Sequence, residues 1–340
     1  MSLLLARRTP SHLTHALRQQ PLPFFRMTAR TQSTLSSFLV SPSQLNAALN
    51  SNAPSHISSA ARTIPLCASW FLPNDPDQRT GRQVFRQTHI PSARFFDLDK
   101  ISDTASPYPH MLPSAATFAA AMENMGIHRD DAVVVYDSAE LGIFSAPRVA
   151  WTLSVFGHPR VHVLNNFRLW LEQGFPVREG AEEQWEKTSY PEPKPDLRRV
   201  VAFNEVREMA KDVGKEGAEP VQILDARSHG RWAGTDPEPR PGLSSGHIPG
   251  SISVPVPDLL DPKTKTLLPA EQLRAVFEGK GVDPRRPIIS SCGTGVTATI
   301  IDAALAEAGY GSPGERRVYD GSWTEWAMRV KPTDNLIVKG

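Results

Sequence analysis

The chain has 340 residues, and its 37 lysines and arginines nearly balance 36 acidic residues, which gives a formal net charge of +1. This length favours two domains, and the charge balance excludes a general attraction to nucleic acid or to an anionic membrane surface. Cys67 and Cys292 are the only cysteines. They are too few for a disulfide scaffold or a structural zinc site, and they suggest a reducing compartment.

Residues 1–35 differ in composition from the rest of the chain. Five arginines lie among Leu, Ser, Thr and Ala, and the first acidic residue of the whole chain is Asp75. This composition is typical of a mitochondrial transit peptide and indicates a location in the matrix. Two alternatives stay open: a disordered basic tail, and a start at Met27 that would give a cytoplasmic form. No apolar run is long enough to span a bilayer.

Beyond residue 40 the sequence repeats itself at an offset of 155 to 158 residues. The tripeptide His-Ile-Pro occurs at 89–91 and at 247–249, and Leu-Pro occurs at 112–113 and at 268–269. A repeat of this length is a whole domain, because solenoid units of a few tens of residues cannot bury a core alone.

Each half alternates short apolar strands with helical stretches, which predicts an α/β fold with a parallel-type sheet flanked by helices. We expect a first half at 36–177, a polar, proline-rich linker at 178–197 and a second half at 198–340. The expected strands are 64–66, 133–136 and 161–164, followed by 221–224, 288–289 and 317–319.

The stretch around Cys292 reads as a strand, a tight loop and a helix. The strand is 288–289, and apolar residues at helical spacing continue to Gly309, which favours a helix end. A thiol in such a loop faces unpaired backbone N–H groups and the positive end of a helix dipole, and both favour the thiolate. Gly293 and Gly295 let the loop curl. The alternative is a buried, inert cysteine, which is common elsewhere.

The sequence Cys-Gly-Thr-Gly-Val-Thr-Ala at 292–298 resembles the active-site loop of the two-domain rhodanese superfamily, and most closely that of its 3-mercaptopyruvate sulfurtransferases. The resemblance implies a rhodanese fold in each half and a sulfur carried as a persulfide on Cys292. Thiosulfate-specific members have an arginine and a lysine where this chain has Gly293 and Thr294. We therefore expect 3-mercaptopyruvate as substrate, with thiosulfate as the alternative. The loop residues expected around the sulfur are Gly293, Gly295, Val296 and Thr297.

Arg231 and Arg240 follow the strand at 221–224. Glycines and prolines in this run predict a loop, where planar guanidinium groups can bind a carboxylate with paired hydrogen bonds. The resemblance transfers the family's substrate-carboxylate arginines to these two positions. Two solvent-paired loop arginines are the alternative.

The resemblance also implies a proton relay built from Asp99, His110 and Thr294. Without the family, the first two residues would be interpreted as a turn carboxylate and a surface histidine. Asp137 occupies the position of the first half that matches Cys292, so the first half has no nucleophile of its own and is expected to support the second. Cys67 is interpreted as a packing residue at a strand end.

No metal and no organic cofactor are expected. The expected partners are 3-mercaptopyruvate and a sulfur acceptor: thioredoxin, a small thiol or cyanide. A relay of the persulfide to a partner protein in transfer-RNA thiolation is an open alternative, whereas direct contacts with nucleic acid or membrane are not expected. Some relatives of this fold are phosphatases with a Cys-x5-Arg loop, but position 298 is alanine, which excludes that chemistry.

Overall fold

The computed structural model of the protein describes residues 35–53 and 60–340. Apart from its last residue, the expected transit peptide lies outside the described residues, and so does the alternative start at Met27. Within the described ranges, no helix has both the length and the hydropathy that crossing a membrane requires.

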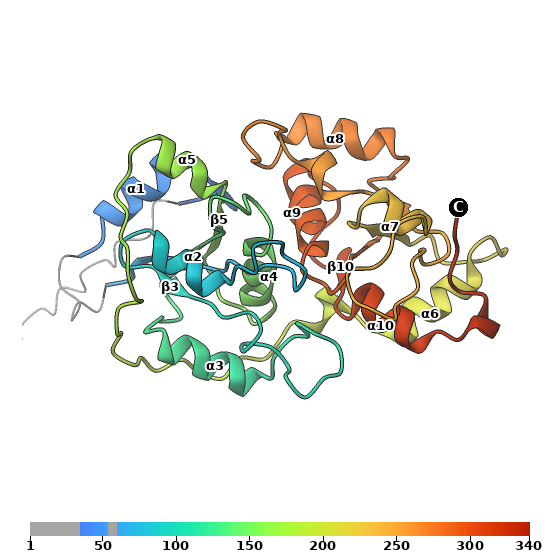
Figure 1. The fold of residues 1–340 in the computed structure, drawn as a ribbon, viewed down its shortest axis with the longest axis horizontal. Coiled ribbons are helices and arrows are strands. Elements are labelled where there is room, and N and C mark those ends of the chain that lie inside the picture. The colour runs from blue at the N-terminus through green and yellow to red at the C-terminus, as the bar shows by residue number, and fades with distance from the viewer. Residues whose placement is uncertain (1–34, 54–59) are drawn as a thin grey trace, which may run out of the picture. The chain divides into compact units, whose positions relative to one another are not determined.

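Two parallel five-stranded sheets, one in each half, form the framework of residues 35–53 and 60–340 (Figure 1). Their strand orders are β1-β5-β4-β2-β3 and β6-β10-β9-β7-β8, so the same topology occurs twice. The tandem α/β prediction is confirmed. The strands are β1 (Leu39–Val40), β2 (Thr63–Cys67), β3 (Arg94–Phe95), β4 (Ala132–Tyr136) and β5 (Val161–Leu164), then β6 (Val200–Val201), β7 (Gln222–Asp225), β8 (Ile252–Ser253), β9 (Ile288–Ser291) and β10 (Arg316–Tyr319).

Helices cover both faces of each sheet. In the first half these are α1 (Pro42–Asn50), α2 (Gly81–Gln87), α3 (Ala115–Asn124), α4 (Ala146–Val155) and α5 (Phe167–Glu172). The second half has α6 (Phe203–Asp212), α7 (His229–Ala233), α8 (Ala270–Gly279), α9 (Ala298–Ala308) and α10 (Ser322–Arg329), with short 3-10 turns at Leu197–Arg199, Val256–Leu259 and Pro332–Asp334. Gly309 ends α9 with a φ of 78°, as the sequence predicts.

The central strand β4 shows why these short runs are so apolar. Val133 and Val135 pack into a cluster with residues of α3 and α4, whereas Val134 and Tyr136 pack with residues of α1, α2 and α5 on the other face. Successive side chains of a strand point to opposite faces, so a strand covered on both faces needs an unbroken apolar run.

The six strands expected from sequence are present: β5 has the expected ends, and the ends of the other five differ by at most two residues. The strands β1, β3, β6 and β8 were not predicted, and they have two residues each. Two residues are too few to produce a periodic pattern, and these strands are defined by their pairing with neighbours.

The two halves meet where α4 packs against α9 (Figure 1). One buried apolar cluster runs through both halves and includes Val149 of α4 and Ile301 of α9. Polar contacts add to it: Asn166 Nδ2 donates to the carbonyl of Thr264 at 2.5 Å. Because these contacts are buried and specific, the junction fixes the two sheets against each other.

The segment 178–197 has no helix or strand before Leu197 but is not a free tether. Tyr190 is buried, and its hydroxyl lies 2.9 Å from Nδ1 of His158 in the first half. Thr188 Oγ1 donates to the carbonyl of Ile127. The segment therefore packs along the first half, which its polar composition did not indicate.

Candidate active site

Cys292 follows β9 directly, at the carboxyl end of the central strand of the second sheet. The first turn of α10 fixes its backbone. The Cys292 N–H donates to Ser322 Oγ at 3.1 Å, and the Trp323 N–H donates to the Cys292 carbonyl at 2.9 Å. Thr324 holds the next carbonyl, that of Gly293, through both its N–H and its hydroxyl. The nucleophile candidate thus sits on an anchored backbone.

Gly295 is required by the loop geometry. Its φ is 74°, and a Cβ at this position would lie 2.5 Å from the backbone oxygen of Asp320. Any other residue would be strained and would collide with that oxygen. The curl of the loop expected from the sequence is therefore present, and it turns the chain from β9 into α9.

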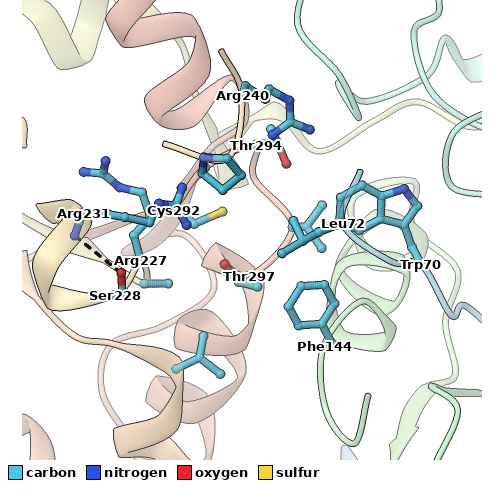
Figure 2. A pocket seen from close by; sticks show the side chains of 15 residues that line it. Trp70, Leu72, Phe144, Arg227, Ser228, Arg231, Arg240, Cys292, Thr294 and Thr297 are labelled. Atoms are coloured by element: carbon cyan, nitrogen blue, oxygen red, sulfur yellow. Dashed lines mark hydrogen bonds between the residues drawn. The ribbon is translucent and has the colours of Figure 1, made fainter. Parts of the chain in front are cut away.

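A pocket of ≈ 150 Å³ opens above the loop (Figure 2). Cys292 is only 1% exposed, and it contributes to the pocket wall. The first half supplies aromatic and aliphatic side chains on the side opposite Arg227 and Arg231 (Figure 2). Four other predicted site residues line the pocket together with Cys292, Arg231 and Arg240: Gly293, Thr294, Val296 and Thr297. The apolar lining is Trp70, Leu72 and Phe144.

Arg231 lies in a helix and not in a loop, so that prediction is wrong. Ser228 Oγ caps α7 by accepting from the Arg231 N–H, and Gly234 ends the helix with a φ of 82°. This short helix forms despite Gly230 because both of its ends are capped. The guanidinium is held by Glu238 at 2.6 Å, and a Cβ on Gly293 would lie 3.3 Å from Arg231 Nη2. Arg231 is thus aimed at the cysteine loop.

Arg240 lies on a loop, as predicted, and lines the same pocket. Among the described residues it has no hydrogen bond or ion pair, in contrast to Arg231. Burial lowers the pKa of Arg240, an effect that the negative charge of the Cys292 thiolate opposes. A half-buried guanidinium without a protein partner is suited to bind an anionic ligand.

Asp99, His110 and Thr294 form a chain of hydrogen bonds across the junction. His110 Nε2 lies 3.1 Å from Asp99 Oδ1, and His110 Nδ1 lies 3.1 Å from Thr294 Oγ1. Since an ionised carboxylate accepts only, Nε2 donates to Asp99 and the neutral ring accepts from the Thr294 hydroxyl at Nδ1. Trp70 completes the arrangement: its Nε1 donates to Asp99 at 2.9 Å, and its ring meets His110 edge-on.

Burial and hydrogen bonding set the protonation states of His110 and Asp99. Burial lowers the pKa of His110 below its usual value of 6.5, with Asp99 acting in the opposite direction. The hydrogen bond from His110 lowers the pKa of Asp99. At neutral pH the site therefore holds a carboxylate beside a neutral imidazole. His110 is buried, so the surface-histidine alternative is wrong.

In the first half, Asp137 follows β4 as Cys292 follows β9, which confirms the match between the two positions. Its carboxylate accepts from the N–H groups of Phe144, Ser145 and Ala146 at 2.8, 3.2 and 2.9 Å. The corresponding loop of the first half thus closes around its own carboxylate. Cys67 ends β2 and is 2% exposed, in agreement with a packing role.

Several residues of the site were missed by sequence reasoning. Two of them are Trp70, which donates to Asp99, and Ser322, which accepts from the Cys292 N–H. Arg148 is the one charged residue of α4, and its side chain is 1% exposed at the junction. A lone charge in an otherwise apolar helix was the signal available for it.

Comparisons with known proteins identify the family of the chain. A family model described as a rhodanese-like domain matches residues 205–329. Thiosulfate sulfurtransferase TUM1 of Saccharomyces cerevisiae is 42% identical, covering 80% of this chain and 90% of the relative. Human 3-mercaptopyruvate sulfurtransferase is 40% identical over 79% of this chain and 86% of the relative.

Two further matches bear on location and fold. An Arabidopsis thaliana protein named thiosulfate/3-mercaptopyruvate sulfurtransferase 1, mitochondrial, is 42% identical over 78% of this chain and 71% of the relative. The crystal structure of Tum1 from Saccharomyces cerevisiae superposes with a TM-score of 0.78 at 38% identity, covering 88% of this chain and 97% of that chain. With this identity over most of its length and this fold, the chain belongs to the rhodanese superfamily and is a sulfurtransferase.

Proposed function

We propose that this sulfurtransferase takes sulfur from 3-mercaptopyruvate, carries it as a persulfide on Cys292 and passes it to a thiol acceptor or to cyanide. The observation that carries the choice of substrate is the hydrogen bond between His110 and Thr294. It connects a proton relay to the cysteine loop. Such a relay is useful only when the leaving group has to take up a proton, as the enolate of pyruvate does.

In the first step the Cys292 thiolate attacks the sulfur of the substrate. An S–S bond forms, the C–S bond breaks, and its electron pair passes to carbon as the enolate of pyruvate. Arg240 binds the carboxylate, because it faces the pocket and has no partner within 35–53 and 60–340, and Arg231, held by Glu238, binds beside it. The N–H groups of the loop from Gly293 to Thr297 stabilise the persulfide anion at the start of α9.

The proton balance closes within the site. The substrate's thiol proton passes through the Thr294 hydroxyl to His110, whose neutral ring can accept it, and Asp99 stabilises the resulting imidazolium. The same proton then returns to the enolate carbon, and pyruvate leaves. No net proton is exchanged with solvent in this half-reaction.

In the second half-reaction an acceptor thiol takes the outer sulfur and regenerates Cys292. Thioredoxin and small thiols are the acceptors that we propose, with a protein of transfer-RNA thiolation as an alternative acceptor. We also propose a mitochondrial location, which the composition of residues 1–35 and the mitochondrial relative support. The division at 36–177 and 198–340 remains our proposal for the domain limits.

The substrate assignment makes a direct prediction for the unaltered protein. Thiosulfate is a small dianion that needs fixed positive charge beside the nucleophile, and Gly293 and Thr294 provide none. We expect kcat/KM for 3-mercaptopyruvate to exceed that for thiosulfate by about 10²-fold, or about 3 kcal/mol. Steady-state assays with cyanide as the common acceptor measure this ratio. Equal or faster turnover of thiosulfate would assign the chain to that substrate instead.

Replacing His110 tests the relay. Because burial lowers the pKa of His110, its neutral form prevails at pH 7, and we expect pyruvate release to slow only as the pH falls below 6.5. In His110→Ala the rate should drop by about 10²-fold, and this acid-side decline should disappear. Single-turnover pyruvate release from pH 4.5 to 8.5 measures both effects. The exposed His128 offers the control variant His128→Ala, and an unchanged profile in His110→Ala would contradict the relay.

A further inference from the structure

Arg148 lies in α4 of the first half, but its guanidinium binds groups of both halves. Nη2 donates to the carbonyl of His110 at 2.5 Å, and Nη1 donates to the carbonyl of Gly295 at 3.3 Å. Nη2 also lies 2.6 Å from Asp320 Oδ1, which provides the counter-charge. Both charged side chains are buried, so these contacts are made away from solvent.

The two carbonyls that Arg148 binds lie on the two sides of the hydrogen bond that crosses the junction within the relay. His110 carries the imidazole, and Gly295 directly follows Thr294, which carries the hydroxyl. His110 has a φ of 64°, a left-handed conformation that a residue with a side chain adopts only when its surroundings hold it there. The guanidinium of Arg148 is one of the groups that hold it.

Asp320 extends the same connection. Its Oδ2 accepts from the Leu112 N–H at 2.8 Å, two residues after His110 in the chain. Its own backbone oxygen packs against Gly295. Arg148 and Asp320 therefore tie the His110 segment of the first half to the cysteine loop of the second.

We infer that Arg148 is a positioning residue for proton transfer, because one rigid guanidinium sets the distance between His110 Nδ1 and Thr294 Oγ1. This inference rests on the proposed function, since it assigns a role within the proposed relay. The Cys292 backbone is fixed separately by Ser322 and Trp323. Loss of Arg148 should therefore impair proton transfer and leave sulfur capture largely intact.

Two substrates separate these steps on the same enzyme. 3-Mercaptopyruvate leaves as an enolate that must be protonated, whereas thiosulfate leaves as sulfite, which needs no proton. In Arg148→Gln we expect kcat with 3-mercaptopyruvate to fall about 10-fold or more at an unchanged KM, since small misplacements of reacting groups have effects of this order. Thiosulfate turnover should stay within about 3-fold of the unaltered protein. Arg148→Lys keeps the positive charge but not the planar guanidinium. Its kcat with 3-mercaptopyruvate should lie between those of the unaltered protein and Arg148→Gln.

A double-mutant cycle completes the test. If Arg148 acts through His110, the variant carrying both His110→Ala and Arg148→Gln should be no slower with 3-mercaptopyruvate than His110→Ala alone. Parallel losses with both substrates, or losses that multiply in the double variant, would overturn the inference. Thiosulfate turnover also reports folding; should Arg148→Gln not fold, Arg148→Lys decides by the same criteria.

The control is Arg94→Lys. Arg94 is equally buried in the first half and donates to the carbonyl of Met125, away from the junction, so both substrates should respond alike to its replacement. The outcomes also distinguish the proposed relay through His110 from the proposed positioning role of Arg148. If His110→Ala itself leaves 3-mercaptopyruvate turnover unchanged, the relay is wrong; if His110→Ala slows it and Arg148→Gln does not, only the role of Arg148 is wrong.

Discussion

Cys292→Ser should abolish sulfur transfer, with a loss of at least about 10⁴-fold in kcat/KM for either sulfur donor. Cys292 is the one cysteine on the pocket wall, and a serine hydroxyl cannot form a persulfide. After treatment with 3-mercaptopyruvate, mass spectrometry of the unaltered protein should find one extra sulfur on the peptide that contains Cys292. The Cys292→Ser protein should show none.

Cys67→Ser is the matched control. Burial raises the pKa of Cys67 to about 12, so this thiol is not ionised at neutral pH. It lies in the apolar cluster of the first half, 3.2 Å from the hydroxyl of Ser69, where a serine can keep a hydrogen bond. The variant should retain activity. An extra sulfur on the Cys67 peptide, or inactivity of folded Cys67→Ser, would refute the assignment of the nucleophile.

Arg240→Gln should reduce kcat/KM for 3-mercaptopyruvate by about 10³-fold, chiefly through KM. The guanidinium is half-buried and has no partner among the described residues, so its removal leaves the substrate carboxylate unpaired in a partly desolvated pocket. Losing one side of such a pair has an effect of about 4 kcal/mol. Steady-state kinetics over a wide substrate range measure it.

Arg240→Lys distinguishes charge from geometry. Lysine keeps the positive charge but cannot make the paired hydrogen bonds, so an intermediate loss is expected. Because Arg231 is already held by Glu238, we do not expect it to replace Arg240. An Arg240→Gln enzyme with unchanged KM would show that the carboxylate binds elsewhere.

The cysteine loop could be predicted from its own residues. The strand before Cys292, the glycines after it and the helix stop at Gly309 are local signals, and the structure contains each of them. Gly293 and Gly295 differ in one respect that the sequence did not show. Only Gly295 has a positive φ. At Gly293, a Cβ would lie 3.3 Å from Nη2 of Arg231, so the close guanidinium favours glycine there.

Contacts between distant residues left no comparable local signal. Asp99 and His110 were named through the family resemblance, since their own neighbourhood suggests only a turn and an exposed ring. Arg148 was passed over because its helix looks like core. The short helix that carries Arg231 was missed because its caps, Ser228 and Gly234, frame only five residues. A single turn is too short for periodicity to reveal.

The bond between His110 and Thr294 joins residues that are 184 positions apart, one in each copy of the duplicated unit. A descendant reduced to the second copy would keep its nucleophile and both arginines but would lose the imidazole and its carboxylate. Under the proposed relay, pyruvate release would therefore depend on the first copy as well, although the loop of that copy is closed around Asp137. If the relay operates as proposed, deletion of the first copy could not undo the duplication without loss of the reaction.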